Sequence, residues 1–134
     1  MNKEQLEETL KQLTDGLLMM SETDAPFEFF YFENPERQAL NKETVAHIAG
    51  KTNSEEIEMQ ELDYFFRNMV RLYPEDGEAR QQEAARFKEL QQKILELLQD
   101  VQVYRASNIG TTVYILGKTE NGDIAGLRTF VIET

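Results

Sequence analysis

The chain has 134 residues, of which 40% are hydrophobic and 29% charged, a composition typical of one folded domain and not of a disordered chain. The absence of cysteine excludes disulfides and thiol chemistry, and a single histidine disfavours a histidine-based metal site. With 25 acidic and 14 basic side chains the net charge is −11, which disfavours direct nucleic-acid binding and favours a basic protein partner, although such acidity also serves solubility alone.

The sequence shows no membrane or export signal. No apolar run is long enough to span a bilayer, and the first seven residues, Met-Asn-Lys-Glu-Gln-Leu-Glu, lack the apolar centre of a signal peptide. We therefore expect a cytoplasmic chain that contacts no membrane.

The N-terminal quarter predicts a helix, an acidic loop and a strand. Leucines recur at the helical period, at positions 6, 10, 13 and 17, which predicts a helix over residues 3–19. The loop follows at residues 21–26, and residues 27–32 are aromatic at every position except Glu28. Because such a run suits a strand covered on both faces, we expect it at the centre of a sheet.

The middle of the chain alternates between helix and strand patterns. We expect a short helix at residues 41–49, a strand at 56–61 and a helix that starts at Asp63. A turn at 74–77 separates this helix from the longest one, predicted over residues 78–100, whose apolar side chains form one stripe.

The last third changes to the strand period. Strands are predicted from Val101, over residues 111–117 and over residues 124–133. Between the last two, Asn121-Gly122 is the dipeptide that a type I′ hairpin turn favours. The sequence thus predicts an α+β fold, with helices packed on a mainly antiparallel sheet that ends in a meander of three strands.

Motifs for catalysis are missing from the sequence. It contains neither the Gly-x-Ser-x-Gly nucleophile motif nor a Gly-rich phosphate loop, and its carboxylates are too numerous for any pair to stand out. Two candidate binding groups remain: the acidic loop with Glu22 and Asp24, and the carboxylate of Thr134, where strand character lasts to the final residue. A solvated loop and a strand that simply ends there are the plain alternatives.

At these residues the chain resembles the nuclease A inhibitor proteins. The likeness covers nearly the whole length, through stretches that occur in order: Asp15–Glu22, Pro26–Phe29, Asp63–Phe66, Ala85–Lys88, Val103–Arg105, Val113–Gly117, Ala125–Leu127 and Val131–Thr134. Their co-occurrence in this order carries the resemblance.

The resemblance implies a fold and a role. It implies a single-domain α-β-α sandwich over residues 1–134 that plugs the active site of a non-specific DNA/RNA endonuclease, whose Mg²⁺ is held in a ββα-metal site. The loop glutamate and the terminal carboxylate, here Glu22 and Thr134, are the groups that would reach that metal. A further contact uses an acidic residue and a tryptophan before the long helix; the corresponding residues include Glu75 and Asp76, and the chain has no tryptophan. No cofactor or metal of its own is implied.

Two alternatives stay open beside a nuclease inhibitor. The first is an acidic binding module of the same fold with a different basic partner, which the missing tryptophan favours. The second is a small acid/base hydrolase, which requires a concave pocket with convergent carboxylates.

Overall fold

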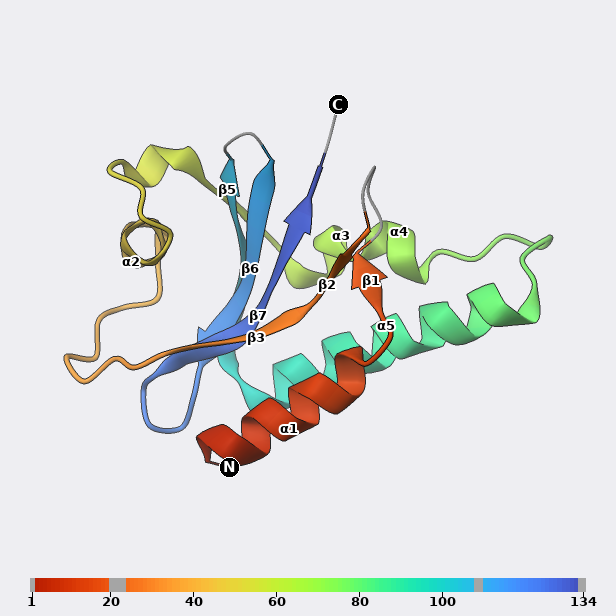
Figure 1. The fold of residues 1–134 in the computed structure, drawn as a ribbon, viewed down its shortest axis with the longest axis horizontal. Helices are drawn as coiled ribbons and strands as arrows, with labels where there is room; N and C mark the ends of the chain where they lie inside the picture. The colour runs from red at the N-terminus through yellow and green to blue at the C-terminus, as the bar shows by residue number, and fades with distance from the viewer. Residues whose placement is uncertain (1, 20–23, 108–109, 133–134) are drawn as a thin grey trace.

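The centre of the fold is an antiparallel sheet of five strands (Figure 1). The computed structural model describes residues 2–19, 24–107 and 110–132; residues 1, 20–23, 108–109 and 133–134 lie outside this description. The described helices are α1 (Lys3–Thr14), α2 (Lys42–Ile48), α3 (Leu62–Phe65), α4 (Arg67–Val70) and α5 (Glu78–Leu97), with a 3₁₀ turn η1 (Ser54–Glu56). The described strands are β1 (Leu18–Met19), β2 (Ala25–Pro26), β3 (Glu28–Phe32), β4 (Ile57–Gln60), β5 (Gln99–Ser107), β6 (Thr111–Lys118) and β7 (Ile124–Val131).

Three consecutive strands, β5, β6 and β7, form the predicted C-terminal meander. The strand order of the large sheet is β3-β7-β6-β5-β4, and every neighbouring pair is antiparallel. A second, smaller sheet consists of β1 and β2. The α+β class, the antiparallel sheet and the meander are therefore confirmed, as are the short helix and the strand predicted between residues 41 and 61.

Helices cover both faces of the large sheet, as expected. On β6, Val113 and Ile115 belong to a core shared with α1, α3, α4 and α5, whereas Tyr114 and Leu116 belong to a second core with α2. Figure 1 shows α1 and α5 along one side of the sheet and α2 on the other. The alternation of strand side chains thus supplies both apolar layers of an α-β-α sandwich. Among the described residues, no helix has both the length and the hydropathy that a membrane crossing requires.

The aromatic strand lies at an edge of the sheet, so the prediction of a central strand is wrong. Among the described strands, β3 pairs with β7 at one end of the five-stranded sheet, and no other described strand of that sheet lies beyond it. Its rings reach both layers from there, because Phe29 and Tyr31 pack against the core with α1, and Phe30 and Phe32 against the core with α2. Large rings bury substantial area even from an edge position, so an aromatic run does not report strand order.

The first helix ends at Thr14 rather than near residue 19, because the chain turns at Gly16. Gly16 has a φ of +77°, a conformation that favours glycine and commonly ends helices. Arg86 of α5 donates to the carbonyl oxygen of Asp15 at 2.6 Å, which holds this end of α1 in place. Leu17 stays buried beyond the turn, and this explains why the leucine pattern extends past the helix.

Two other helix boundaries differ from the predictions. α3 begins at Leu62, and the Asp63 carboxylate accepts a hydrogen bond from the adjacent Tyr64 amide instead of capping the helix. The longest helix, α5, ends at Leu97, and the chain enters β5 at Gln99.

The hairpin at Asn121-Gly122 is confirmed, but its turn is not of type I′. Gly122 has a φ of +84°, whereas Asn121 is not among the residues with positive φ. The Gly122 amide donates to the Thr119 carbonyl oxygen at 3.0 Å. This is the pattern of a type I turn followed by a glycine bulge, in which a single residue needs positive φ.

Candidate functional site

The acidic loop joins two short strands that pair with each other. Glu22 lies outside the described residues, as do the other residues of the segment 20–23. The strands on either side are described: Met19 of β1 lies opposite Ala25 of β2. Asp24, which precedes β2, is exposed. The two ends of the loop are therefore held at the spacing of an antiparallel pair.

The C-terminal strand runs beside this pair. β7 ends at Val131, and Thr134 lies outside the described residues. The hydroxyl of Thr129 on β7 donates to the carbonyl oxygen of Pro26 on β2 at 2.9 Å, and Thr129 is only 1% exposed. Both β1 and β2 contact β7, and Figure 1 shows the three strands close together. The strand that leads to the C-terminus is therefore tied to the strand that follows the acidic loop.

Antiparallel pairing sends both segments toward the same end of the sheet. In the register of β3 with β7, Glu28 lies opposite Arg128, so each step back from Glu28 matches a step forward from Arg128. The segments that carry Glu22 and Thr134 therefore begin at one end of the sheet. That these two residues share one exposed side stays a prediction, because both lie outside the described residues.

The other predicted contacts, Glu75 and Asp76, lie on the loop between α4 and α5. The Asp76 carboxylate accepts a hydrogen bond from the Tyr73 amide at 2.7 Å and so shapes the loop, whereas Glu75 is exposed. One nitrogen of Arg80 donates to the carbonyl oxygens of Asn68, Met69 and Arg71, at 3.1, 2.8 and 3.1 Å. In Figure 1 this loop lies apart from the end of β7. How Glu75 and Asp76 lie relative to Glu22 and Thr134 stays a prediction, because Glu22 and Thr134 lie outside the described residues.

Comparison of the sequence with models of known protein families identifies the family of this chain. A family model described as NuiA, nuclease A inhibitor-like protein, matches residues 4–134. The chain belongs to the nuclease A inhibitor-like family. No curated protein matches it significantly. The resemblance that the sequence shows is therefore confirmed at the level of the family, over nearly all of the chain.

In this nuclease A inhibitor-like chain, the end of β7 also exposes apolar side chains that sequence reasoning missed. Phe130 is 48% exposed and Ile132 is 38% exposed, while Val131 between them is 4% exposed. Aromatic side chains are enriched at the centres of protein interfaces, so Phe130 is a candidate contact. The residues of 127–132 alternate between buried and more exposed positions in the structure, but the sequence Leu-Arg-Thr-Phe-Val-Ile has no matching alternation of apolar and polar residues that would have revealed Phe130.

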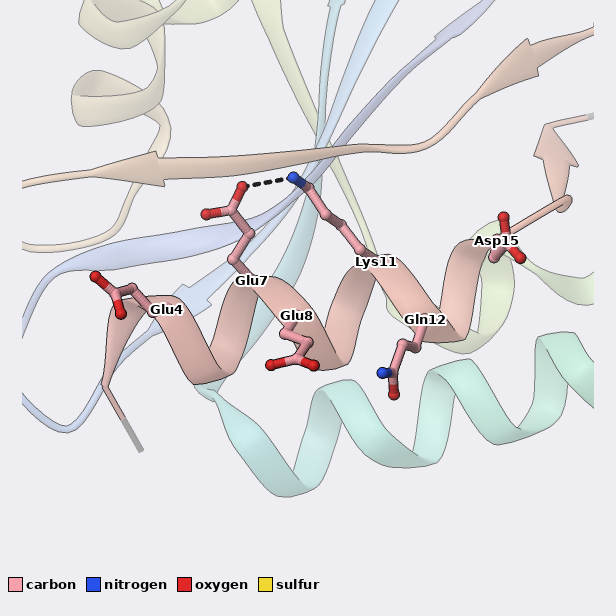
Figure 2. A pocket seen from close by; sticks show the side chains of 6 residues that line it. All are labelled: Glu4, Glu7, Glu8, Lys11, Gln12 and Asp15. Carbon is pink, nitrogen blue, oxygen red and sulfur yellow. Dashed lines mark ion pairs between the residues drawn. The ribbon is translucent and has the colours of Figure 1, made fainter.

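The hollow along the outer side of α1 presents carboxylates that diverge (Figure 2). It is lined by Glu4, Glu7, Glu8, Lys11, Gln12 and Asp15. Glu7 pairs with Lys11 at 2.8 Å, and Glu8 points to another side of the helix. Within the described parts of the chain, no three histidine or acidic side chains form a group that could hold a metal ion. The hollow therefore lacks the convergent carboxylates that an acid/base hydrolase requires.

Proposed function

We propose that this chain is a protein inhibitor of a Mg²⁺-dependent, non-specific DNA/RNA endonuclease with a ββα-metal site, and that it plugs the active site with acidic groups. We place it in the cytoplasm as one domain of residues 1–134, without catalysis, cofactor or metal of its own. Membership of the nuclease A inhibitor-like family supports the inhibitor role. The observation that supports this mechanism most is the hydrogen bond between β2 and β7. It joins the strand that follows the loop of Glu22 to the strand that leads to Thr134.

Two carboxylates suit a magnesium site that cleaves phosphodiesters. Mg²⁺ is a hard cation that prefers carboxylate and phosphate oxygens. In the proposed complex one of the carboxylates of Glu22 and Thr134 occupies the place of the scissile phosphate at the metal. The other pairs with a lysine or arginine that normally holds substrate, with Asp24 adding negative charge beside them. Such a pair is worth about 1 kcal/mol at contact in water, and more where the interface excludes solvent.

The loop of residues 71–77 is the second proposed contact. Glu75 is exposed there and Tyr73 is 52% exposed, so an acidic and an aromatic side chain lie close in sequence on one loop. Asp76 accepts the hydrogen bond from the Tyr73 amide that shapes this loop. We therefore assign the direct contact to Glu75 and a supporting role to Asp76.

Inhibition of a Mg²⁺-dependent non-specific nuclease tests the proposal. We expect Glu22→Ala, and separately a chain extended beyond Thr134, to weaken binding by about 2 kcal/mol or more, roughly 30-fold, as truncations at interface centres do. The matched control is Glu58→Ala, because Glu58 is an exposed glutamate on β4, at the opposite edge of the sheet from β3. If both altered chains inhibit like the parent, the assignment of Glu22 and Thr134 is wrong.

An acidic binding module with a different basic partner is the second candidate function. The absence of tryptophan favours it, because the resemblance implies a tryptophan contact before the long helix. Capture of partners from the native host on the immobilised chain, followed by a nuclease assay, separates the two. Captured nuclease activity that the free chain suppresses supports the inhibitor, whereas a captured basic protein without such activity supports the module.

A further inference from the structure

We propose that β4 is a docking edge, to which an extended basic segment of a protein partner adds as a further strand of the sheet. In this mode of recognition, main-chain hydrogen bonds supply affinity and side chains supply selectivity. The proposal does not depend on the proposed function, because β5 and β6 separate β4 from β7 in the sheet. It gives the chain a second interaction surface.

The outer side of β4 carries main-chain groups that no described segment covers. Among the described strands, β4 is the last in the sheet order and pairs with β5 alone. The Ile57 amide donates to the Ser54 carbonyl oxygen, so it points away from β5. Because these groups alternate along a strand, the amide and the carbonyl of Met59 point the same way. Outside the sheet, neither group bonds to the rest of the described chain, so both are open to an added strand.

The side chains around this edge are acidic, which decides the kind of partner. Between residues 52 and 66 the sequence has no lysine, arginine or histidine. The five acidic side chains of this stretch are all exposed: Glu55, Glu56, Glu58, Glu61 and Asp63. A second copy of this chain would bring the same five carboxylates to the edge, and their repulsion disfavours such pairing. A basic segment is attracted instead, because its charge is complementary.

The alternation of side chains on β4 specifies the pattern of the partner segment. Ile57 belongs to the core with α2, and Met59, which faces the same side, is 39% exposed. Glu58 faces the other side of the sheet. A strand that pairs with β4 places each side chain beside its neighbour on the same face. The segment that fits therefore alternates, with an apolar side chain beside Met59 and basic side chains on the face of Glu58.

Two peptides of equal charge test the required alternation by calorimetry on the full chain. The probe is a capped peptide in which lysine and valine alternate. The control peptide has the same composition with its lysines and its valines in two separate blocks. We expect the alternating peptide to bind about 5-fold tighter or more, because it alone offers both faces to β4. Equal binding of the two peptides would show that charge alone attracts them and would overturn strand addition.

Hydrogen exchange of single amides tests the main-chain contact. The Met59 amide points outward, whereas the amides of Glu58 and Gln60 point toward β5 by the same alternation. With the alternating peptide at about ten times its dissociation constant, exchange at Met59 should slow about 10-fold. Exchange at Glu58 and Gln60 should be slow with and without the peptide. Unchanged exchange at Met59 in the peptide-bound chain overturns the proposal.

Charge reversal at each edge of the sheet separates local contact from the net charge. Glu58→Lys alters β4, and the matched control is Glu33→Lys, because Glu33 is exposed and follows β3 at the opposite edge. Each variant replaces a carboxylate by a cation and changes the net charge from −11 to −9. At about 0.1 M salt we expect Glu58→Lys to weaken binding of the alternating peptide about 5-fold and Glu33→Lys less than about 2-fold.

A milder pair of variants keeps this comparison available if the charge reversal prevents folding. Glu58 lies opposite Arg105 of β5, so a lysine there places two cations side by side. Glu58→Gln and Glu33→Gln remove the charge without reversing it, and we expect weakening of about 2- to 3-fold for Glu58→Gln alone. Equal weakening by the variants at the two edges would show that only the net charge matters and would overturn the docking edge.

Discussion

A single carboxylate, Asp123, joins the β6–β7 turn to the segment that follows β3. One of its oxygens accepts a hydrogen bond from the Tyr31 hydroxyl, and the other accepts from the Asn34 amide at 2.8 Å. Asn34 in turn donates to the carbonyl oxygens of Gln38 and Gly122. The hydrogen bond from Tyr31, followed by that from Asn34, lowers the pKa of Asp123. Burial, followed by the hydrogen bond to Asp123, raises the pKa of Tyr31 to about 12.

We expect Tyr31→Phe to lower the free energy of unfolding at neutral pH by about 1 to 2 kcal/mol, because it removes a hydrogen bond to a charged group. The sign of the pH dependence follows from the raised pKa of the tyrosine. The unfolded phenol ionises near 10 and the folded one near 12, so the parent loses stability as the pH rises through this interval. The Tyr31→Phe variant loses less stability over this pH interval than the parent. Part of the loss remains, because burial also raises the pKa of Tyr104 to about 12.

Urea unfolding at about pH 7, 9 and 11 measures this difference, with Tyr64→Phe as the control because Tyr64 is 52% exposed. At acid pH, the lowered pKa of Asp123 gives the opposite pH dependence, since the protein loses stability as the pH falls. Its contribution is present above the ordinary carboxyl pKa of about 4 and is lost as the pH falls through the folded value. Equal alkaline losses in Tyr31→Phe and the parent would show that the phenol does not contribute.

At the scale of elements, β7 fits between β3 and β6 because position 126 is glycine. Gly126 lies opposite Phe30 of β3 and Leu116 of β6. A Cβ atom there would lie 1.8 Å from the carbonyl oxygen of Ile115, and the φ of Gly126 is +155°. We expect Gly126→Ala to lower the free energy of unfolding by about 3 kcal/mol or more, since backbone of β6 must move to admit the methyl group.

Gly110→Ala is the matched control for this substitution. A Cβ atom at Gly110 would lie 3.8 Å from the nearest atom, the carbonyl oxygen of Val131, which is an ordinary contact. We expect a change below about 1 kcal/mol, measured by urea unfolding alongside Gly126→Ala. A Gly126→Ala chain as stable as the parent would contradict the close approach of β6 and β7.

How far the sequence predicts the elements depends on whether the deciding contact is local. The meander, α2 and β4 follow from periodicity within each segment, and the structure confirms them. The end of α1 does not follow from local periodicity, because the turn at Gly16 is held by Arg86, which lies 71 residues beyond Asp15. The edge position of β3 depends in the same way on which strands pair, and an aromatic run reports burial without reporting neighbours.

The candidate site is predicted less completely than the fold. Resemblance points to Glu22 and Thr134, and the family is confirmed, but both residues lie outside the described structure. The bond between Thr129 and Pro26 joins positions 103 residues apart, and no local pattern signals such a contact. Phe130 becomes a candidate only when the orientation of β7 is fixed by its buried neighbours.

At the scale of the whole molecule, the net charge of −11 acts on a basic partner before contact. This attraction speeds encounter and is screened by salt, with a Debye length of about 30 Å at 0.01 M and about 10 Å at 0.1 M. Part of the charge lies on α1, where Glu4 and Glu8 are exposed (Figure 2). The N-terminal part of α1 lies far from the end of the sheet that β7 reaches in Figure 1. Charge placed there should affect association and not dissociation.

Binding kinetics with a Mg²⁺-dependent non-specific nuclease test this separation. Glu4→Gln/Glu8→Gln changes the net charge from −11 to −9, since two carboxylates are neutralised. We expect it to slow association about 2- to 5-fold at low salt, to match the parent at about 0.5 M salt, and to leave dissociation unchanged. Glu22→Ala should instead speed dissociation and leave association nearly unchanged, because a carboxylate at the contact acts once the two proteins have docked. Faster dissociation of Glu4→Gln/Glu8→Gln would instead place α1 inside the interface.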